Sequence, residues 1–295
     1  MAAGRAKASG GRKAVSATGL DGATVLQKIA RDCVAELVAA LGSARAGDAE
    51  TVHRMRVAIT RLRSAVAFFA PIAADAQWLR LKREVKWLNA SLGAARDNDV
   101  MAEYARRKRY RAWAGGEEFG RRGKRDRRRL MRHLRSDRVR RLLAALSGWA
   151  ERGRWLARWK EAVRRGDAEP LQDYCARELD RWRRRLIRHG QHLSKLNSAR
   201  RHRLRIRAKR FRYMLEALAE IVGMPRLAEL RRMHNAAKRL QRALGDMRDL
   251  RRFAKRSASV GKNGKRRPPG YRRQKEKLRS AAVRAGHDLK QAGPR

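Results

Sequence analysis

Two segments of the chain present histidine and basic residues in nearly the same order. The segment that begins at Val52 reads VHRMRVAITRLRSAVAFF, and the segment that begins at Arg201 reads RHRLRIRAKRFRYMLEAL. At about 100° per residue of an α-helix, His53, Arg56 and Arg63 fall within a sector of roughly 80°, together with Thr60. Imidazole and guanidinium groups on one helix face can donate hydrogen bonds to an anion.

The second segment repeats this stripe 149 residues later, as the pair His53 and His202 shows. Its members are His202, Arg205, Lys209 and Arg212. A neighbouring apolar stripe accompanies each basic stripe, and we expect it to face a helical core. The apolar residues are Met55, Ile59, Leu62 and Val66 in the first segment, and Leu204, Phe211 and Leu215 in the second.

A looser repeat follows each of these segments. LKREVKWLNASLGAARDND (81–99) matches RMHNAAKRLQRALGDMRDL (232–250) at an offset of 152 residues. One helix face of the first copy holds Lys82, Lys86, Asn89, Gly93 and Arg96, and the same face of the second holds His234, Lys238, Gln241, Gly245 and Arg248. Two motifs that recur in the same order indicate an internal repeat, and we expect two similar helical bundles with approximate two-fold symmetry.

The composition supports an anionic partner. The chain has 77 Lys+Arg against 28 Asp+Glu, a formal net charge of +49, while 43% of its residues are hydrophobic. Such self-repulsion predicts a polyanion as ligand, and the apolar content predicts that most of the chain folds. Six prolines and few aromatic residues favour an all-α fold. The four stripes would then form two halves of one basic groove.

The cysteines and the apolar runs indicate in which cellular compartment the protein is expected. Cys33 and Cys175 lie far apart without metal-ligand spacing, so we expect two packing thiols in a reducing, cytoplasmic compartment. The longest apolar run, AVAFFAPIAA, is too short to span a bilayer, so no membrane partner is expected.

Charge and turn residues divide the chain into four parts. We expect a disordered basic arm at 1–20, a first helical half at 21–163, a second half at 170–255 and a basic, mostly disordered tail at 256–295. The boundary is RRGDAEP (164–170), where acid, Gly and Pro interrupt the basic helices. We also expect helix breaks at Gly93 and Gly245, with Asp97 and Asp99 in the first turn of a new helix.

Phosphate is the anion that the residue types favour. Arginine dominates the stripes, and its planar group suits two-point contact with phosphate oxygens. Trp87, Phe211 and Tyr213 lie beside the stripes and fit the core or rim better than a base-stacking platform. The arginines should lower the pKa of His53 and His202.

No catalytic or cofactor motif accompanies the stripes. The sequence has no Gly-rich phosphate loop, no HExxH, no GxSxG and no acidic cluster that could hold Mg²⁺, so we expect no cofactor, no metal site and no enzymatic activity. Asp97, Asp99 and Asp249 fit a role as partners of nearby arginines. Two alternatives stay open: a nucleic-acid-binding protein of the nucleoid or of RNA, which would also use the basic residues 106–141, and a hydrolase of phosphoanhydrides.

Four motifs together resemble the CHAD domain, the conserved histidine α-helical domain. They are VHRMRVAITRLRSAVAFF, LGAARDNDV, SDRVRRLLAALSGW and RHRLRIRAKRFRYMLEAL, and the resemblance covers roughly residues 20–255. It implies two four-helix bundles related by pseudo-two-fold symmetry, with a basic groove or pore between them. It also implies binding of inorganic polyphosphate and association with polyphosphate granules.

The resemblance also implies which residues face the ligand. They are His53, Arg56, Arg63, Lys86, Arg96, His202, Arg205, Lys209, Arg212, Lys238 and Arg248. Thr60 departs from the family pattern, which usually has a basic residue there. The acidic strands of the CYTH-type triphosphatase domain, to which many relatives are fused, are missing from this sequence, so it is expected to be the binding module alone.

Overall fold

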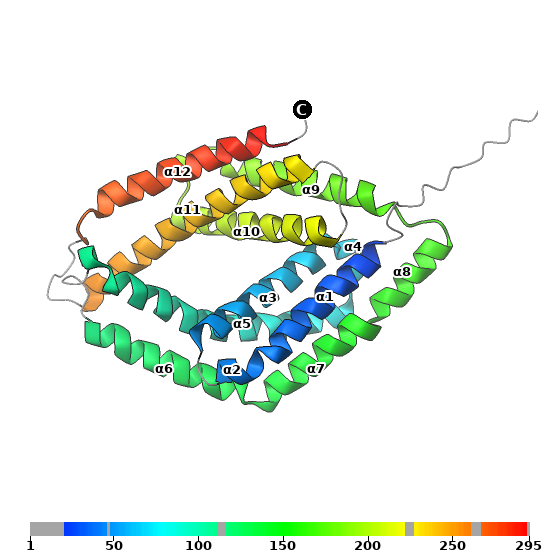
Figure 1. The fold of residues 1–295 in the computed structure, drawn as a ribbon, viewed down its shortest axis with the longest axis horizontal. Helices are drawn as coiled ribbons and strands as arrows, with labels where there is room; N and C mark the ends of the chain where they lie inside the picture. Colours follow the sequence, from blue (N-terminus) through cyan, green and yellow to red (C-terminus); the bar gives the residue numbers. More distant parts are fainter. Residues whose placement is uncertain (1–20, 46–47, 111–115, 222–226, 261–266, 294–295) are drawn as a thin grey trace, which may run out of the picture.

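The computed structural model describes residues 21–45, 48–110, 116–221, 227–260 and 267–293 (Figure 1). All regular secondary structure in these ranges is helical, which confirms the all-α fold. The α-helices are α1 (Gly22–Ala39), α2 (Leu41–Arg45), α3 (Ala49–Phe68), α4 (Ala70–Ala73), α5 (Ala76–Arg106), α6 (Gly116–Leu134), α7 (Asp137–Arg152), α8 (Arg154–Arg164), α9 (Leu171–Gly190), α10 (Ser198–Ile221), α11 (Leu227–Val260) and α12 (Tyr271–Gln291), with 3-10 turns η1 (Lys108–Tyr110) and η2 (Leu193–Lys195).

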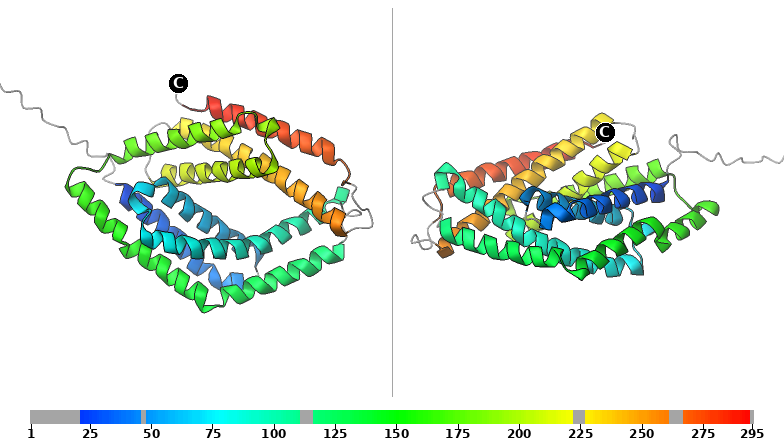
Figure 2. Two further views of the ribbon diagram at one scale, coloured as in Figure 1. Left: turned by 180° about the vertical axis from the view of Figure 1, so that it is seen from behind. Right: turned by 60° about the horizontal axis from the view of Figure 1, so that its bottom comes forward.

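Eight of the helices form two groups of four, and α6 packs against α5 beside the first group. In the first group α1 and α5 each pack against both α3 and α7, and in the second α10 and α12 each pack against both α9 and α11. Figure 2 shows the same two groups from behind and tilted forward. The groups meet where α3 lies against α10 and α5 lies against α11. The two-fold relation between them stays a prediction.

The predicted apolar stripes form the core of α3 and α10. Asp48 caps α3 by accepting hydrogen bonds from the backbone N–H groups of Glu50 and Thr51, the latter at 2.8 Å. Asn197 Oδ1 accepts from the N–H of Arg200 at 2.9 Å at the start of α10. The buried stripe residues are Met55, Ile59, Leu62, Val66, Leu204, Phe211 and Leu215. They belong to one hydrophobic core that runs through both groups, so the basic faces of the two helices are held in fixed positions.

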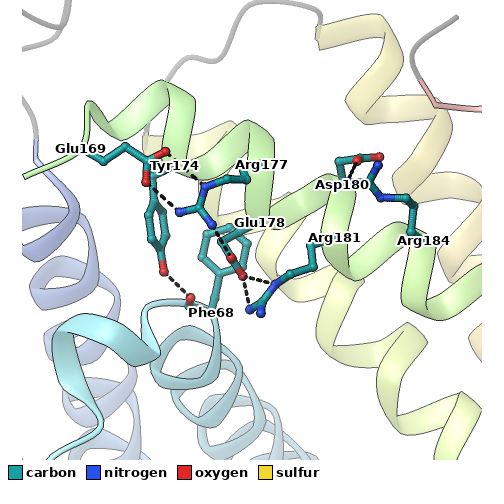
Figure 3. Close-up of polar contacts among 8 residues, drawn as sticks. All are labelled: Phe68, Glu169, Tyr174, Arg177, Glu178, Asp180, Arg181 and Arg184. Carbon is teal, nitrogen blue, oxygen red and sulfur yellow. Dashed lines mark hydrogen bonds and ion pairs between the residues drawn. The ribbon is translucent and has the colours of Figure 1, made fainter.

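A polar contact of α9 also joins the two groups, beside ion pairs within α9 itself (Figure 3). The buried Tyr174 hydroxyl donates to the carbonyl oxygen of Phe68 at 2.6 Å. Glu178 is only 3% exposed, and its carboxylate accepts from Arg177 and Arg181. A buried carboxylate is stable when it is paired in this way. The Tyr174 contact fixes α9 at the carboxyl end of α3 and so helps to set the position of the second group.

The expected helix breaks at the two glycines are wrong. α5 passes through Gly93 and α11 passes through Gly245 without interruption, so Asp97 and Asp99 lie inside a helix rather than at its start. A glycine inside a helix costs only about 1 kcal/mol relative to alanine. The buried neighbours Leu92 and Leu244 belong to the core, and this packing outweighs the cost.

The prediction of a mostly disordered tail at 256–295 is wrong for most of its length. α11 extends to Val260, and α12 (Tyr271–Gln291) supplies the fourth helix of the second group. Its buried residues are Tyr271, Ala282, Ala285 and Leu289. Alanines let a helix pack closely without large side chains, which is why the low content of large apolar residues was misleading. The predicted arm at 1–20 lies outside the described residues.

Candidate anion-binding site

A cavity of about 880 Å³ lies between α3, α5, α10 and α11. Its basic lining side chains among the described residues are Arg56, Arg63, Arg205, Lys209, Arg210, Arg248, Arg252, Lys255 and Arg256. Against these nine cations the same lining holds two carboxylates, Asp97 and Asp126. The excess of positive charge in a cavity with protein walls favours the entry of an anion.

The two copies of the repeat contribute matched residues to this cavity. Gly93 and Gly245 lie opposite Arg56 and Arg205 respectively. A methyl group added to Gly93 would lie 3.9 Å from Nη2 of Arg56, and one added to Gly245 would lie 3.7 Å from Cδ of Arg205. The charge of Arg205 also lowers the pKa of Arg56, although burial is the larger cause. Arg56 and Arg63 of the first stripe therefore line the same space as His202, Arg205 and Lys209 of the second.

Lys209 lies where the two stripes meet. Its Nζ donates a hydrogen bond to Oγ1 of Thr60 at 3.4 Å, and the Thr60 hydroxyl donates to the carbonyl oxygen of Arg56 at 2.7 Å. No carboxylate of the described residues pairs with this ammonium group. Burial, followed by the charges of Arg56, Arg205 and Arg212, lowers the pKa of Lys209 to about 7.

His202 lines the same cavity and has an unpartnered ring nitrogen. Its Nδ1 is buried and makes no hydrogen bond within the described residues, and the same holds for Nε of Arg205. A buried polar atom without a partner is costly, so these two atoms are unsatisfied in the ligand-free protein. The pKa of His202 is lowered, as predicted, but burial is the largest cause and Arg248 and Arg205 come second.

His53 has a similar environment without lining the cavity. Burial is the main cause that lowers its pKa, and the charge of Arg96 adds to this effect. Neither residue is among those that line the cavity. The structure thus places the histidines of the two repeats differently with respect to this space.

Several other predicted residues also lie outside the cavity lining. Lys82, Lys86 and Lys238 are exposed. Arg212 and His234 both contact Oε1 of Glu216, which accepts from Nε2 of His234 at 2.7 Å. Glu216 lies one turn after Arg212, so this neutralising pair was visible in the sequence as an i, i+4 spacing. Contact between these residues and an anion stays a prediction.

Sequence reasoning missed the basic residues at the end of α11. Arg252 and Arg256 follow Arg248 at intervals of four and extend its stripe along the cavity. The expected end of the helix near residue 254 hid Arg256, although Arg252 lay within the expected helix. Asp97 accepts from Nη1 of Arg252 at 2.6 Å, and its Oδ2 lies 3.7 Å from Nη2 of Arg248. Asp97 is therefore an arginine partner, as expected, at the wall of the cavity.

The aromatic residues stand apart from the cavity. None of the described lining residues is aromatic. Phe211 and Tyr213 are buried, and Trp87 packs at the edge of the core with the guanidinium of Arg138 4.0 Å from its ring centroid. These positions agree with the predicted core and rim roles.

Comparison with known proteins assigns the family. The sequence-family model of the CHAD domain matches residues 28–257, so the chain belongs to the CHAD domain family. The crystal structure of the CHAD domain from the plant Ricinus communis is similar with a TM-score of 0.69 at 22% identity, covering 91% of this chain and 93% of that chain. PptA from Streptomyces chartreusis is similar with a TM-score of 0.61 at 15% identity, covering 92% of this chain and 98% of that chain.

These structural similarities concern the fold, since both identities are low. A search of curated proteins found no match. Within the described part of the chain, no helix combines the length and apolar character that a membrane span requires.

Proposed function

We propose that this protein binds inorganic polyphosphate in the cavity between the two helix groups. The observation that carries the proposal is the cavity's uncompensated charge. Arg56, Arg63, Arg205, Lys209 and Arg210 line it, and none of them forms a salt bridge with a carboxylate of the described residues. Cations gathered in a partly buried space repel one another, and a polyanion stabilises them.

A phosphate chain suits the donors better than a compact anion does. Its repeated anionic groups can contact several cations at once, and arginine can bind phosphate oxygens through two parallel hydrogen bonds. Neutralisation of several charges releases counterions, which adds to the affinity. The family resemblance given by the sequence points to the same ligand.

The carboxylates of the cavity favour binding without catalysis. Asp97 is engaged by Arg252, and Asp126 accepts a hydrogen bond from Nδ2 of Asn98. Both contacts hold carboxylates in place among basic groups, so neither acid is poised to activate water or to hold a metal ion. We therefore infer a non-enzymatic binding module that acts in the cytoplasm, on polyphosphate granules.

A competition experiment separates this proposal from nucleic-acid binding. Labelled long-chain polyphosphate would be bound at about 0.15 M ionic strength, where distant surface charges are screened. Duplex DNA or tRNA would then be added at matched phosphate concentration. We expect polyphosphate to resist displacement, because a double helix is too wide to enter a cavity of about 880 Å³, whereas a single phosphate chain can. Ready displacement by either nucleic acid would contradict the proposal.

Phosphate release tests the non-enzymatic part. The protein would be incubated with long-chain polyphosphate and Mg²⁺ or Mn²⁺, and free phosphate would be measured over time. We expect no release above that of a sample without protein. Sustained release that purified Asp97→Asn protein lacks would show a hydrolase instead.

A further inference from the structure

The exposed face of α6 carries a row of four arginines. Arg121, Arg125, Arg129 and Arg132 are all exposed, and we call them the α6 ridge. Their spacing places them within a sector of about 80°, and they extend over about 17 Å of helix. None of the four forms a salt bridge or a hydrogen bond within the described residues.

The positive charge of the α6 ridge has no acidic partner among the described residues, although another arginine of the same helix is paired. Arg127, which lies on another face of the same helix, contacts Oδ1 of Asp99 on α5 at 2.6 Å. Asp126 is the one acid among the described side chains of α6, and it accepts from Asn98 instead of from a ridge arginine. Like charges at i and i+4 destabilise a helix. An anion on the ridge would remove that repulsion.

Asp126 connects the ridge to the central cavity. It is one of the residues that line the cavity, and it also lines a second hollow of about 710 Å³. The other described residues around this second hollow are the four ridge arginines. In Figure 1, α6 runs beside α5, and α5 contributes Gly93 and Asp97 to the cavity wall. The cavity and the second hollow thus share one lining residue, the carboxylate Asp126, and basic side chains line both hollows on either side of it.

We infer that a polyphosphate chain too long for the cavity leaves it past Asp126 and continues along the α6 ridge. This inference rests on the proposed function, and it adds a second contact region that only long chains reach. A short chain occupies the cavity alone. The ridge therefore makes the protein prefer long chains over short ones.

Two properties of the ridge favour a linear polyanion over separate small anions. Its arginines are exposed, so a single small anion would gain little from any one of them in water. A chain that is already held in the cavity brings its next phosphates to the ridge at a high effective concentration. The weak contacts then add to an affinity that the cavity has established.

The test compares two ligand lengths on the full chain. Tripolyphosphate and long-chain polyphosphate would be titrated into the parent and into a ridge variant that carries Arg121→Gln, Arg125→Gln, Arg129→Gln and Arg132→Gln. A control variant would carry Arg31→Gln, Arg154→Gln, Arg185→Gln and Arg188→Gln. These control arginines are exposed residues of α1, α8 and α9 that line neither hollow, so both variants lose the same charge.

We expect the ridge variant to bind long chains on the order of 10-fold to 100-fold more weakly than the control variant does. The slope of log affinity against log salt should become shallower by about 3, since four phosphate contacts are lost. Tripolyphosphate should bind all three proteins alike, which also shows that the ridge variant is folded.

Other results would overturn the inference in distinguishable ways. If ridge and control variants bind long chains equally, the ridge is only a solvated basic face. If the ridge variant loses affinity for tRNA but not for polyphosphate, the ridge is a nucleic-acid surface. If the parent binds neither tripolyphosphate nor long chains, the proposed function itself fails. A cavity variant with Arg56→Gln and Arg205→Gln should lose both lengths, and long-chain binding that survives it would show that the ridge acts without the cavity.

Discussion

Nζ of Lys209 lies 3.4 Å from Oγ1 of Thr60, and the two residues occupy the same position in the two copies of the repeat. A second cation at this distance from Lys209 would add repulsion to a site that already lowers the lysine pKa to about 7. The threonine instead gives the ammonium group a hydrogen-bond acceptor.

Polyphosphate affinity should fall as the pH rises from about 7 to about 9. The free protein loses the Lys209 proton near pH 7, whereas a bound polyanion favours the ammonium form and raises its pKa. Binding therefore takes up a proton in this interval, and each step upward in pH weakens it. We expect a loss of roughly tenfold, measured by titration calorimetry in buffers of different ionisation enthalpy.

The variant Lys209→Met tests whether the ammonium group of Lys209 causes this pH dependence of the affinity. Burial and nearby arginines lower the pKa of both His53 and His202 below the ordinary value of 6.5 in the free protein, so of these three groups Lys209 is the one whose free-state pKa lies nearest to this pH interval. The variant should bind more weakly at pH 7 but with an affinity that stays level up to pH 9. An unchanged pH dependence in the variant would assign the proton to another group.

Asp97 should act as an internal competitor of the ligand. Its carboxylate contacts Arg252 and lies near Arg248, two cations of the cavity. Asp97→Asn should raise polyphosphate affinity on the order of 3-fold to 10-fold, because these arginines gain freedom and one negative charge is lost. Without ligand, the same variant should unfold at lower temperature, since the arginines then lack their partner.

The control for Asp97 is Asp180→Asn. Asp180 pairs with Arg183 and Arg184 on α9, and none of these residues lines the cavity. This variant removes the same charge and should leave polyphosphate affinity within about twofold of the parent, because Asp180 does not line the cavity and charges far from the ligand are screened by salt. Equal gains in affinity for both variants would show that net charge, and not Asp97, sets the affinity.

Tyr174→Phe should destabilise the fold without changing ligand affinity. The lost hydroxyl donates to the Phe68 carbonyl oxygen at 2.6 Å in a buried position (Figure 3). An unsatisfied buried acceptor should lower the free energy of unfolding by about 1–2 kcal/mol. Denaturant unfolding measures this change, and unaltered stability would mean that the contact does not help to join α9 to α3.

The sequence predicted the paired stripes of α3 and α10 because their spacing leaves no other helical face for the core. Met55 and Leu204 are buried, and Arg56 and Arg205 line the cavity beside them. Periodicity alone could not show which stripes face each other. That arrangement depends on the packing of α3 against α10 across the two groups.

The wrong predictions of helix ends and of the C-terminal tail have causes in the packing around the residues concerned. Gly93 and Gly245 were expected to end helices, but the core on both sides of each glycine holds the helix together. α12 was missed because its buried residues include alanines such as Ala282 and Ala285, which a search for large apolar residues overlooks. The role of Glu216 as the shared partner of Arg212 and His234 required side-chain positions from two helices.

The most direct test of the account is the polyphosphate affinity of a variant with Arg56→Gln and Arg205→Gln. Both arginines lie in the cavity without a carboxylate partner, so neutral amides should relieve repulsion and leave the fold intact. A control with Arg31→Gln and Arg188→Gln removes two exposed charges outside the cavity. We predict that the cavity variant binds long-chain polyphosphate on the order of 100-fold more weakly than this control. Equal binding by the two variants would contradict the cavity as the binding site.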